Sequence, residues 1–456
     1  MFAAQGLMSS FVRISRSPQV KELPKRMSAT YDESVTDTLK AESEPEIVVD
    51  PLAHLSAEQV EEVYQRYLEG EKTSDLILEF GIQTKNTSLL KLLPHIERND
   101  LVCPHCGLFA SQKRPAKNSC GNSPACTGCD HVYPIYRGDS CRCTGCMVEY
   151  LGEANGEGVH GRVIYDGLAL REKIILLAAL NLTEVGSRDE TSFSIHQRKV
   201  WHHRLAPTPE YRDKCIKELF DRHVILVSSD TTFDALDFYR KHDRFDFLRW
   251  TPNVSTTDAA EFAMEFSALQ FRIIHDLMHR KLELQSVLIE LIYELAEEDL
   301  LEYVRYRVES TSLDFTAERA TREVLRSLLA SSSVSNIFSF IWKAVREAED
   351  SLKNKTVNGP THAGNKISSA IVRAAEYWES GPSKQKEYER PKQSKICQIS
   401  EVVYSLILDD PDGSFKMLLP RYSSEILRPV LEGISTAQEA KRSLRDSSRN
   451  RFSRQL

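Results

Sequence analysis

The sequence predicts a mainly α-helical protein that carries a compact cysteine-rich module in its first third. Two observations lead to this fold class. Apolar residues recur at helical spacing over most of the chain after residue 160. Eight of the ten cysteines lie within the 44 residues from Cys103 to Cys146. Clustering of this density indicates a module that a metal ion stabilises.

Length and composition limit the classes of protein to consider. The 456 residues are enough for two or three domains, and 41% hydrophobic and 27% charged residues are ordinary for a globular protein. A net charge of −7 argues against a protein that coats nucleic acid over its whole surface. No apolar run is long enough to span a membrane. Cysteine pairs without a secretory signal indicate the reducing cytoplasm, although disulfides are the alternative.

Residues 1–50 are expected to form a disordered N-terminal extension. The stretch up to Lys21 has three cations and no acid, which weakly imitates an organellar transit peptide. The alternative is that the true start codon is Met27 and not Met1. The rest of the extension is acidic and rich in serine and threonine, a composition typical of disorder.

Residues 54–100 predict three short helices. Ser56 begins a capping-box pattern for the first helix, and Gly70 ends that helix. A second helix ends at Gly81, and a third is expected to begin near Thr87. Two short helices separated at a glycine, with a third behind them, have the spacing of a helix-turn-helix.

The stretch from Tyr67 to Ile82 resembles the helix-turn-helix of site-specific recombinases, transposases and small bacterial regulators, where a glycine precedes the recognition helix. The resemblance covers about 40 residues and implies DNA binding. Amide and hydroxyl side chains of the recognition segment can pair with base edges, and its lysines can contact phosphates. The candidate residues are Gln83, Lys85, Asn86, Thr87 and Lys91. The alternative is a plain three-helix packing unit.

Residues 101–150 form the cysteine-rich module, and its spacing is typical of zinc sites. Cys103 and Cys106 form one Cys-x-x-Cys pair, and Cys126 and Cys129 form a second pair about 20 residues further on. Four thiolates complete the tetrahedral shell of a structural zinc ion. Two such turns resemble a zinc ribbon.

A second group of ligands follows directly. Cys141, Cys143 and Cys146 indicate a second site, with His131 or Cys120 as its fourth ligand. We therefore expect one or two zinc ions. A shell saturated with protein ligands leaves no position for water, so the expected role is structural and not catalytic.

The loop between the two cysteine pairs is basic. Lys113, Arg114 and Lys117 are candidates for contacts to nucleic-acid phosphates, which position a protein without specifying sequence. The alternative is a solvated loop.

Helical patterns dominate the rest of the chain. We expect a mixed, mostly helical domain over 162–254, in which a winged-helix-like unit is an alternative, an α-helical domain over 255–435, and a basic disordered tail over 436–456. Elements predicted within them are helices at 168–180, 209–222, 255–309, 316–331, 334–353, 365–379 and 396–408, and a strand at 224–227. The acids Glu294, Glu297, Glu298 and Asp299 are expected to form a solvated acidic face.

One pattern echoes a catalytic motif. His275 and His279 lie one helical turn apart with Asp276 between them, which weakly imitates the metallohydrolase His-Glu-x-x-His. No third ligand follows, and aspartate has a shorter reach than glutamate. We therefore assign no catalytic residue and expect no enzyme.

These observations lead to one hypothesis and one alternative. The hypothesis is a bacterial, zinc-stabilised DNA-binding protein, regulatory or accessory to a mobile element or a defence system. In it the helix-turn-helix and the zinc module contact DNA, and the helical domain binds a partner or forms a homo-oligomer. The alternative is a zinc-stapled protein-interaction subunit of a multiprotein system, without direct DNA contact. Neither involves a membrane.

Overall fold

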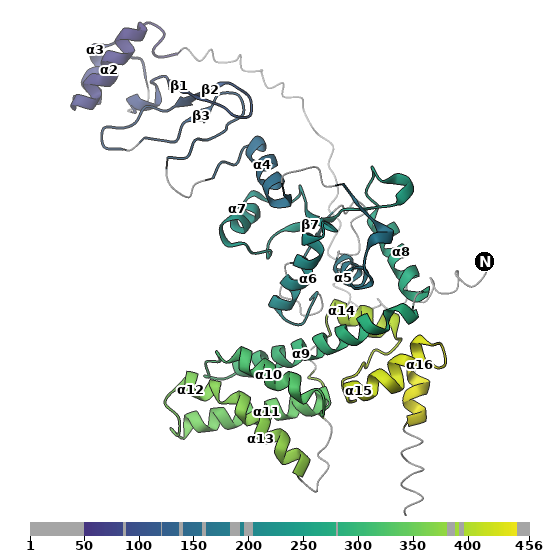
Figure 1. Cartoon of the computed structure of the whole chain (residues 1–456). Helices are drawn as coiled ribbons and strands as arrows, with labels where there is room; N and C mark the ends of the chain where they lie inside the picture. The colour runs from purple at the N-terminus through teal and green to yellow at the C-terminus, as the bar shows by residue number, and fades with distance from the viewer. Residues whose placement is uncertain are drawn as a thin grey trace, which may run out of the picture. The chain divides into compact units, whose positions relative to one another are not determined.

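The computed structural model describes residues 50–84, 88–119, 121–135, 140–156, 161–182, 192–195, 204–279, 281–380, 388–391 and 396–444. The chain divides into two compact units, Met1–Leu93 and Pro94–Leu456 (Figure 1). Helices predominate in the described part, which confirms the predicted mainly α fold class. None of these helices combines the length and the hydropathy that a bilayer crossing requires. The expected N-terminal extension lies outside the described residues except for Asp50.

The first unit begins as predicted, with helix α2 (Ala57–Glu69). The capping box is formed: Gln59 N donates to Ser56 Oγ at 3.2 Å, and Ser56 N donates to Gln59 Oε1 at 2.9 Å. Gly70 ends the helix with a φ of 105°, a left-handed conformation that favours glycine. Helix α3 (Thr73–Glu79) follows after a short turn.

The third helix expected from Thr87 is not formed in the described residues. Only the three-residue 3-10 turn η1 (Leu89–Lys91) stands there. Residues 85–87 lie outside the described part. The small core is made by Leu52, Val60, Val63, Tyr64, Leu76, Ile82, Leu89 and Leu93. Leu89 and Leu93 are therefore used for packing, as predicted, but a three-residue turn presents no helical face.

The second unit begins with a small antiparallel sheet in the order β1-β2-β3. Its strands are β1 (Ile96–Val102), β2 (Phe109–Gln112) and β3 (Ala125–Cys126), and helix α4 (Thr144–Asn155) follows them. The turn between β1 and β2 carries the first cysteine pair. The sheet therefore brings cysteines that are distant in sequence to one end of a hairpin.

The middle of the second unit combines helices with short strands. Its elements are β4 (Val163–Ile164), η2 (Tyr165–Gly167), α5 (Leu170–Leu180), β5 (Phe193–Ser194), α6 (Pro209–Asp221), β6 (Ile225–Val227), α7 (Phe233–His242), β7 (Arg249–Pro252), β8 (Val254–Ser255) and η4 (Thr257–Ala259). β5, β7 and β6 form an antiparallel sheet, and β4 pairs with β8 in parallel. The predicted helices at 168–180 and 209–222 and the predicted strand at 224–227 are confirmed.

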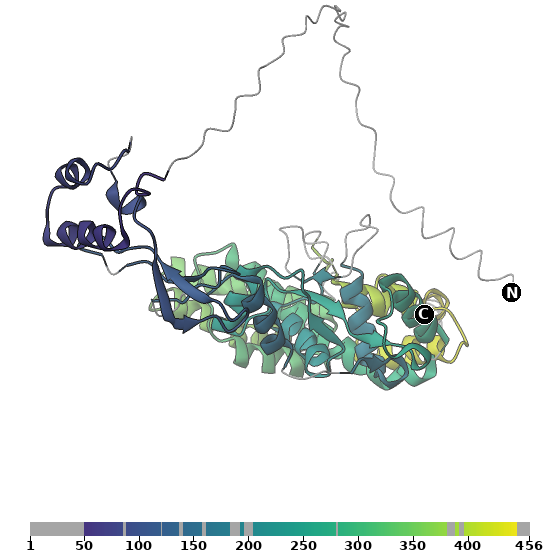
Figure 2. The ribbon, with the colours of Figure 1, turned by 90° about the horizontal axis from the view of Figure 1, so that it is seen from above.

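The C-terminal part is almost wholly helical. Its elements are α8 (Phe266–His279), η5 (Lys281–Leu284), α9 (Gln285–Glu309), α10 (Glu318–Leu328), α11 (Val334–Lys353), α12 (Pro360–Asn365), α13 (Ile367–Ser380), α14 (Gln398–Ser400), the π-helix η6 (Glu401–Ile407), α15 (Leu419–Tyr422), the π-helix η7 (Ser423–Leu427) and α16 (Arg428–Leu431). Helices α9, α10, α11 and α13 pack side by side (Figure 1 and Figure 2).

Two predicted boundaries in this part are wrong. The continuous helix expected over 255–309 is broken into η4, α8, η5 and α9. The tail expected to be disordered from residue 436 is helical over residues 437–444, which bury Ala437 and Ala440, and residues 445–456 lie outside the described part. Lys441 Nζ there donates to Asp410 Oδ1 and to the carbonyl of Gly413.

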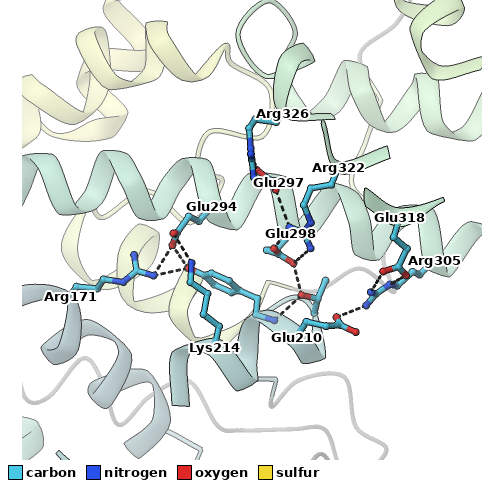
Figure 3. A network of polar contacts seen from close by, with 12 residues as sticks. Arg171, Glu210, Lys214, Glu294, Glu297, Glu298, Arg305, Glu318, Arg322 and Arg326 are labelled. Carbon is cyan, nitrogen blue, oxygen red and sulfur yellow. Dashed lines mark hydrogen bonds and ion pairs between the residues drawn. The ribbon is translucent and has the colours of Figure 1, made fainter. Parts of the chain in front are cut away.

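The predicted solvated acidic face on α9 is also wrong, because its glutamates form ion pairs (Figure 3). Glu297 and Glu298 are only 7% and 6% exposed. Arg322 donates to both carboxylates, and Arg326 Nε donates to Glu297 Oε2 at 2.7 Å. Thr208 Oγ1 donates to Glu298 as well. Buried carboxylates are tolerated because each has charged or polar partners.

The same network continues toward α5 and α6. Glu294 accepts hydrogen bonds from Arg171 at 2.7 Å, from the Tyr211 hydroxyl at 2.6 Å and from Lys214 at 3.1 Å (Figure 3). Arg305 bridges Glu210 on α6 and Glu318 on α10. Helix α9 therefore joins the middle of the unit to the C-terminal helices through polar contacts as well as through its apolar side chains.

We expect Arg322→Met to lower the free energy of unfolding by about 2 to 3 kcal/mol, because it removes a partner from two buried carboxylates. The expected loss lies at the lower end for buried pairs because the Arg322 side chain is 28% exposed. Urea denaturation measures it. The matched control is Arg319→Met on the same helix, where the side chain is 95% exposed. An equal loss of unfolding free energy in both variants would contradict the stabilising role of the Arg322 ion pairs.

Stability should also fall at acidic pH. Burial acts to raise the pKa of Glu294 and of Glu297, but hydrogen bonds from Tyr211 and Arg171, and from Arg326 and Arg322, outweigh it and lower both pKa values below 4.5. A carboxyl with a lowered folded-state pKa stabilises the fold above its unfolded pKa of about 4.3, and loses that contribution as pH falls through the folded value. Unfolding free energy should therefore decline below about pH 4.5. Glu297→Gln should show a shallower decline, and an unchanged slope would argue against this origin.

Candidate metal centre

The first ligand set is assembled as the sequence predicts. One sulfur atom from each of Cys103, Cys106, Cys126 and Cys129 lies within 4.8 Å of the others. The Sγ atoms of Cys103 and Cys129 are 3.4 Å apart, and those of Cys106 and Cys126 are 3.2 Å apart. A disulfide would require about 2.05 Å. Sulfurs around a tetrahedral ion with metal–sulfur bonds of about 2.3 Å lie about 3.8 Å apart. The donor set therefore fits a metal ion.

Backbone amides shape the two turns that carry these thiols. Cys103 N donates to the Leu108 carbonyl at 2.8 Å, and Gly107 closes the turn with a φ of 74°. Gly128 N donates to Cys126 Sγ at 3.3 Å. Amide donors of this kind stabilise a thiolate, which is the form that binds a metal.

The four thiols cannot all ionise together without a cation. The Gly128 amide lowers the pKa of Cys126 to about 6. The backbone amide of His131 acts in the same direction on Cys129, but burial and the neighbouring thiols outweigh it and raise the pKa of Cys129 to about 12. Because thiolates at this separation repel one another, a divalent cation is the natural counter-charge.

The second ligand set contains one residue that the sequence analysis missed. His105, His131, Cys143 and Cys146 place one donor atom each within 4.8 Å of the others. Cys146 Sγ lies 3.2 Å from His105 Nε2 and 3.2 Å from His131 Nδ1, and Cys143 Sγ lies 3.7 Å from His131 Nδ1. Two imidazoles and two thiolates are a common structural zinc shell.

His105 connects the two donor sets. It lies between Cys103 and Cys106 in the first turn, yet its ring reaches the second set. A Cβ atom added at Gly145 would lie 2.7 Å from His105 Cδ2 and Nδ1. Likewise a Cβ at Gly128 would lie 2.6 Å from Leu108 Cδ1. The glycines therefore admit side chains from the first turn.

The signal for this arrangement is present in the sequence. Cys-Thr-Gly-Cys occurs twice, at Cys126–Cys129 and at Cys143–Cys146. The repeated glycine marks where another part of the module approaches the backbone closely. Spacing rules did not reveal His105, because it lies inside a cysteine pair that was already assigned.

The imidazoles have an environment that suits metal binding. Burial and the neighbouring His105 lower the pKa of His131. His131 therefore stays neutral near pH 7, and neutral imidazole is the form that coordinates a metal. The His105 and His131 rings meet edge to face with centroids 5.0 Å apart, and the rings of His131 and Tyr133 also meet edge to face with centroids 4.8 Å apart.

Cys141 lies beside the second set and is not one of its four members. Its Sγ accepts hydrogen bonds from Val132 N at 3.1 Å and from Cys143 N at 3.4 Å. It packs with Cys143 and Cys146 in one small buried cluster. Cys120, the other ligand considered, lies outside the described residues.

The second set is fixed to the body of the unit through α4 and α7. The Arg240 guanidinium lies 3.9 Å from the Tyr150 ring centroid, and Arg142 NH2 donates to Asp234 at 3.0 Å. Ser140 Oγ donates to Asp237 at 2.8 Å. A cavity of about 710 Å³ lies between this set and α7.

The structure describes some of the residues predicted to contact nucleic acid, but not all of them. Lys113, Lys117 and Lys91 are exposed, as is Gln83. Arg114 Nε instead donates to the Pro94 carbonyl at 3.1 Å. The predicted contacts Lys85, Asn86 and Thr87 lie outside the described residues.

The histidine pair on α8 has no metal-binding partner among the described residues. His275 and His279 stack with centroids 4.0 Å apart, and His279 Nδ1 lies 2.7 Å from the His275 carbonyl. Asp276 accepts a hydrogen bond from the buried Lys173 at 2.7 Å. The carboxylate of Asp276 is therefore ion-paired with a lysine.

Comparisons with protein families, curated proteins and solved structures gave no match for this chain. The geometry of the centre is therefore the basis for its assignment.

Removing one ligand of the first set should unfold the module. Metal binding to such a site contributes about 10 kcal/mol or more of folding free energy. Cys103→Ser and Cys129→Ser should therefore lose bound metal and ordered structure over residues 96–150, measured by elemental analysis and hydrogen exchange. Cys215→Ser, at a buried cysteine outside the centre, is the control and should keep its full metal content. Retention of all metal in Cys103→Ser would contradict the ligand assignment.

The second set gives a sharper test, because His105 and Cys141 were distinguished only by the structure. In cobalt-substituted protein the sulfur-to-metal absorption counts the thiolate ligands. Cys141→Ser should keep two ions and the full absorption, whereas His105→Ala should bind the second ion at least about tenfold more weakly. Gly145→Ala should resemble His105→Ala, and Gly152→Ala, where the added Cβ meets nothing within 4 Å, should behave as wild type. Loss of the second ion in Cys141→Ser alone would reverse the assignment.

Proposed function

We propose that this chain is a zinc-stabilised binding protein, in which the metal module presents a surface to a protein partner. The observation that carries the proposal is the pair of donor sets made wholly of cysteine and histidine. Four protein ligands saturate a tetrahedral zinc ion, so the ions stabilise a fold and leave no position for a substrate. The antiparallel sheet with a cysteine pair in its hairpin supports a zinc-ribbon-like module.

The module carries an exposed apolar surface beside its first metal site. Val102, Leu108 and Phe109 are 55%, 50% and 49% exposed, and Val102 is the cross-strand partner of Phe109. We call these three residues the hairpin patch. Large apolar side chains grouped on a small rigid module are typical of a surface that binds another protein.

The charge of the first unit also supports a protein partner. Residues 50–93 contain eight acids and four cations. Arg66, one of those cations, is held by Glu71 at 2.8 Å and by Glu79 at 2.7 Å. A net acidic unit repels the phosphate backbone, which supplies most of the affinity of DNA-binding proteins.

Duplex DNA is the second candidate ligand, and two exposed cations favour it. Lys113 and Lys117 lie on the loop between β2 and β3, away from the hairpin patch in sequence. On this proposal they contact phosphates, and the helix-turn-helix-like segment with Gln83, Lys85, Asn86, Thr87 and Lys91 reads the bases. The centre then holds the loop in position.

One set of variants separates the two candidates. Val102→Asp with Phe109→Asp should abolish co-purification of a partner from the native host while zinc content stays at the wild-type value. Lys113→Glu with Lys117→Glu should leave that co-purification intact, because exposed loop charges contribute little to an apolar interface. Retention of the partner by the patch variant would contradict the protein-binding proposal.

The DNA proposal predicts the opposite pattern. The chain should shift duplex DNA with strong salt dependence, and the two lysine reversals should weaken binding and flatten the salt slope by about one per lost contact. The hairpin-patch variant serves as the control and should bind DNA as the wild type does. No shift at low salt would exclude this candidate.

A further inference from the structure

The second donor set has one more thiol beside it than a tetrahedral ion can bind. His105, His131, Cys143 and Cys146 provide four donor atoms within 4.8 Å of one another, which is a complete shell. Cys141 is a further candidate donor, and it packs in the same buried cluster as the two cysteines of the set. A metal ion bound by the four donors therefore leaves the Cys141 thiol uncoordinated.

The uncoordinated thiol is a direct neighbour of the two cysteines of the donor set. Its sulfur interacts with the thiols of both Cys143 and Cys146. The backbone amide of Cys143 also donates to Cys141 Sγ at 3.4 Å, which holds the sulfur beside the set. Thiols that already touch need little movement to form a disulfide. Such a bond between Cys141 and either cysteine would remove one thiolate from the metal shell.

The first donor set has no such surplus thiol among the described residues. Its four cysteines are all members of the shell, and the described cysteines outside the module, Cys215 and Cys397, are buried in the body of the unit. Oxidation at the first set must therefore begin on a sulfur that the ion itself occupies. Because a bound metal competes with an oxidant for the electrons of a thiolate, we expect the second set to react first.

A cavity gives small molecules a path to this thiol. It is the cavity of about 710 Å³ between the second set and α7, and Cys141 and Cys143 both line it. Ser140, Thr144 and Lys241 add polar groups to its wall. Cys141 is only 4% exposed, so the solute that reaches it must be small and compatible with polar walls. Hydrogen peroxide, which is little larger than water and forms the same hydrogen bonds, is a solute of this kind.

We propose that Cys141 is a modification site for peroxides, and that its oxidation releases the metal ion of the second donor set. The thiol sulfur attacks one peroxide oxygen and the O–O bond breaks, which yields the sulfenic acid of Cys141 and one water. The sulfur of Cys143 or Cys146 then attacks the sulfenic sulfur, a disulfide forms, and the hydroxyl leaves as a second water with a proton from solvent. Two thiols lose two electrons and one peroxide gains them. The proposal rests on the metal-stabilised module of the proposed function, and not on which partner that module binds.

Zinc release from the full, metal-loaded chain tests the proposal, with hydrogen peroxide as the oxidant and a zinc-sensitive dye as the readout. The wild type should release one ion well before the other. Cys141→Ser, which should hold both ions before treatment, should release that ion at least about tenfold more slowly, because the first sulfur to be oxidised is missing. Cys215→Ser is the matched control and should respond as the wild type does. Equal release rates in Cys141→Ser and in the wild type would overturn this proposal alone, whereas a wild-type chain that never binds a second ion would overturn the assignment of the second set as well.

Peptide mapping by mass spectrometry identifies the bond that forms. After treatment with an equimolar amount of peroxide, Cys141 should be linked to Cys143 or to Cys146, and the four cysteines of the first set should still be reduced. Dithiothreitol should break the link and restore the uptake of one zinc ion, because a disulfide is reversible where higher oxidation states of cysteine are not. A first disulfide that does not include Cys141 would contradict the proposal.

Discussion

The mutual repulsion of closely placed thiolates is the constraint on which the metal module depends. Four sulfur atoms lie within 4.8 Å of one another at the first site, and none of the buried apolar clusters formed by the described residues includes the four cysteines. Without a cation, the electrostatics favour protonated thiols and an open hairpin. When a cation is bound, the four sulfur atoms become the strongest cross-link in the module. That cross-link can hold the short strands and tight turns in place, together with the exposed apolar side chains that they carry.

The body of the second unit solves a related problem in a different way. Helix α9 has buried residues along most of its length, yet it carries Glu294, Glu297 and Glu298. Arginines from α5 and α10 form ion pairs with these carboxylates. The protein's own side chains therefore neutralise the negative charge on α9, whereas thiolates in the cysteine-rich module would need a bound cation. The arginine fork suits this role because it binds carboxylates in a fixed geometry. The cysteine-rich module and helix α9 thus each place negatively charged groups close together, and each provides a defined position for the positive charge that compensates them.

Sequence reasoning succeeded where a single local rule decides the outcome. The capping box at Ser56, the proline start of α6 and the four cysteines of the first site each follow from short-range chemistry. It failed where tertiary contacts decide. Glu297 can be buried because Arg322 and Arg326, which lie on another helix, form ion pairs with its carboxylate. The sequence near Glu297 does not show this. His105 joins the second donor set because the fold brings Gly145 close to its ring.

The position of His105 also links the two sites in their order of assembly. An ion bound by Cys103 and Cys106 fixes the backbone on both sides of His105, so the conformational entropy of that segment is already lost when the second ion arrives. If both donor sets bind an ion, occupancy of the first set therefore raises the affinity of the second, and by reciprocity an ion in the second set raises the affinity of the first. A centre of this kind would load and lose its two ions cooperatively, so its occupancy would change steeply with the concentration of free metal.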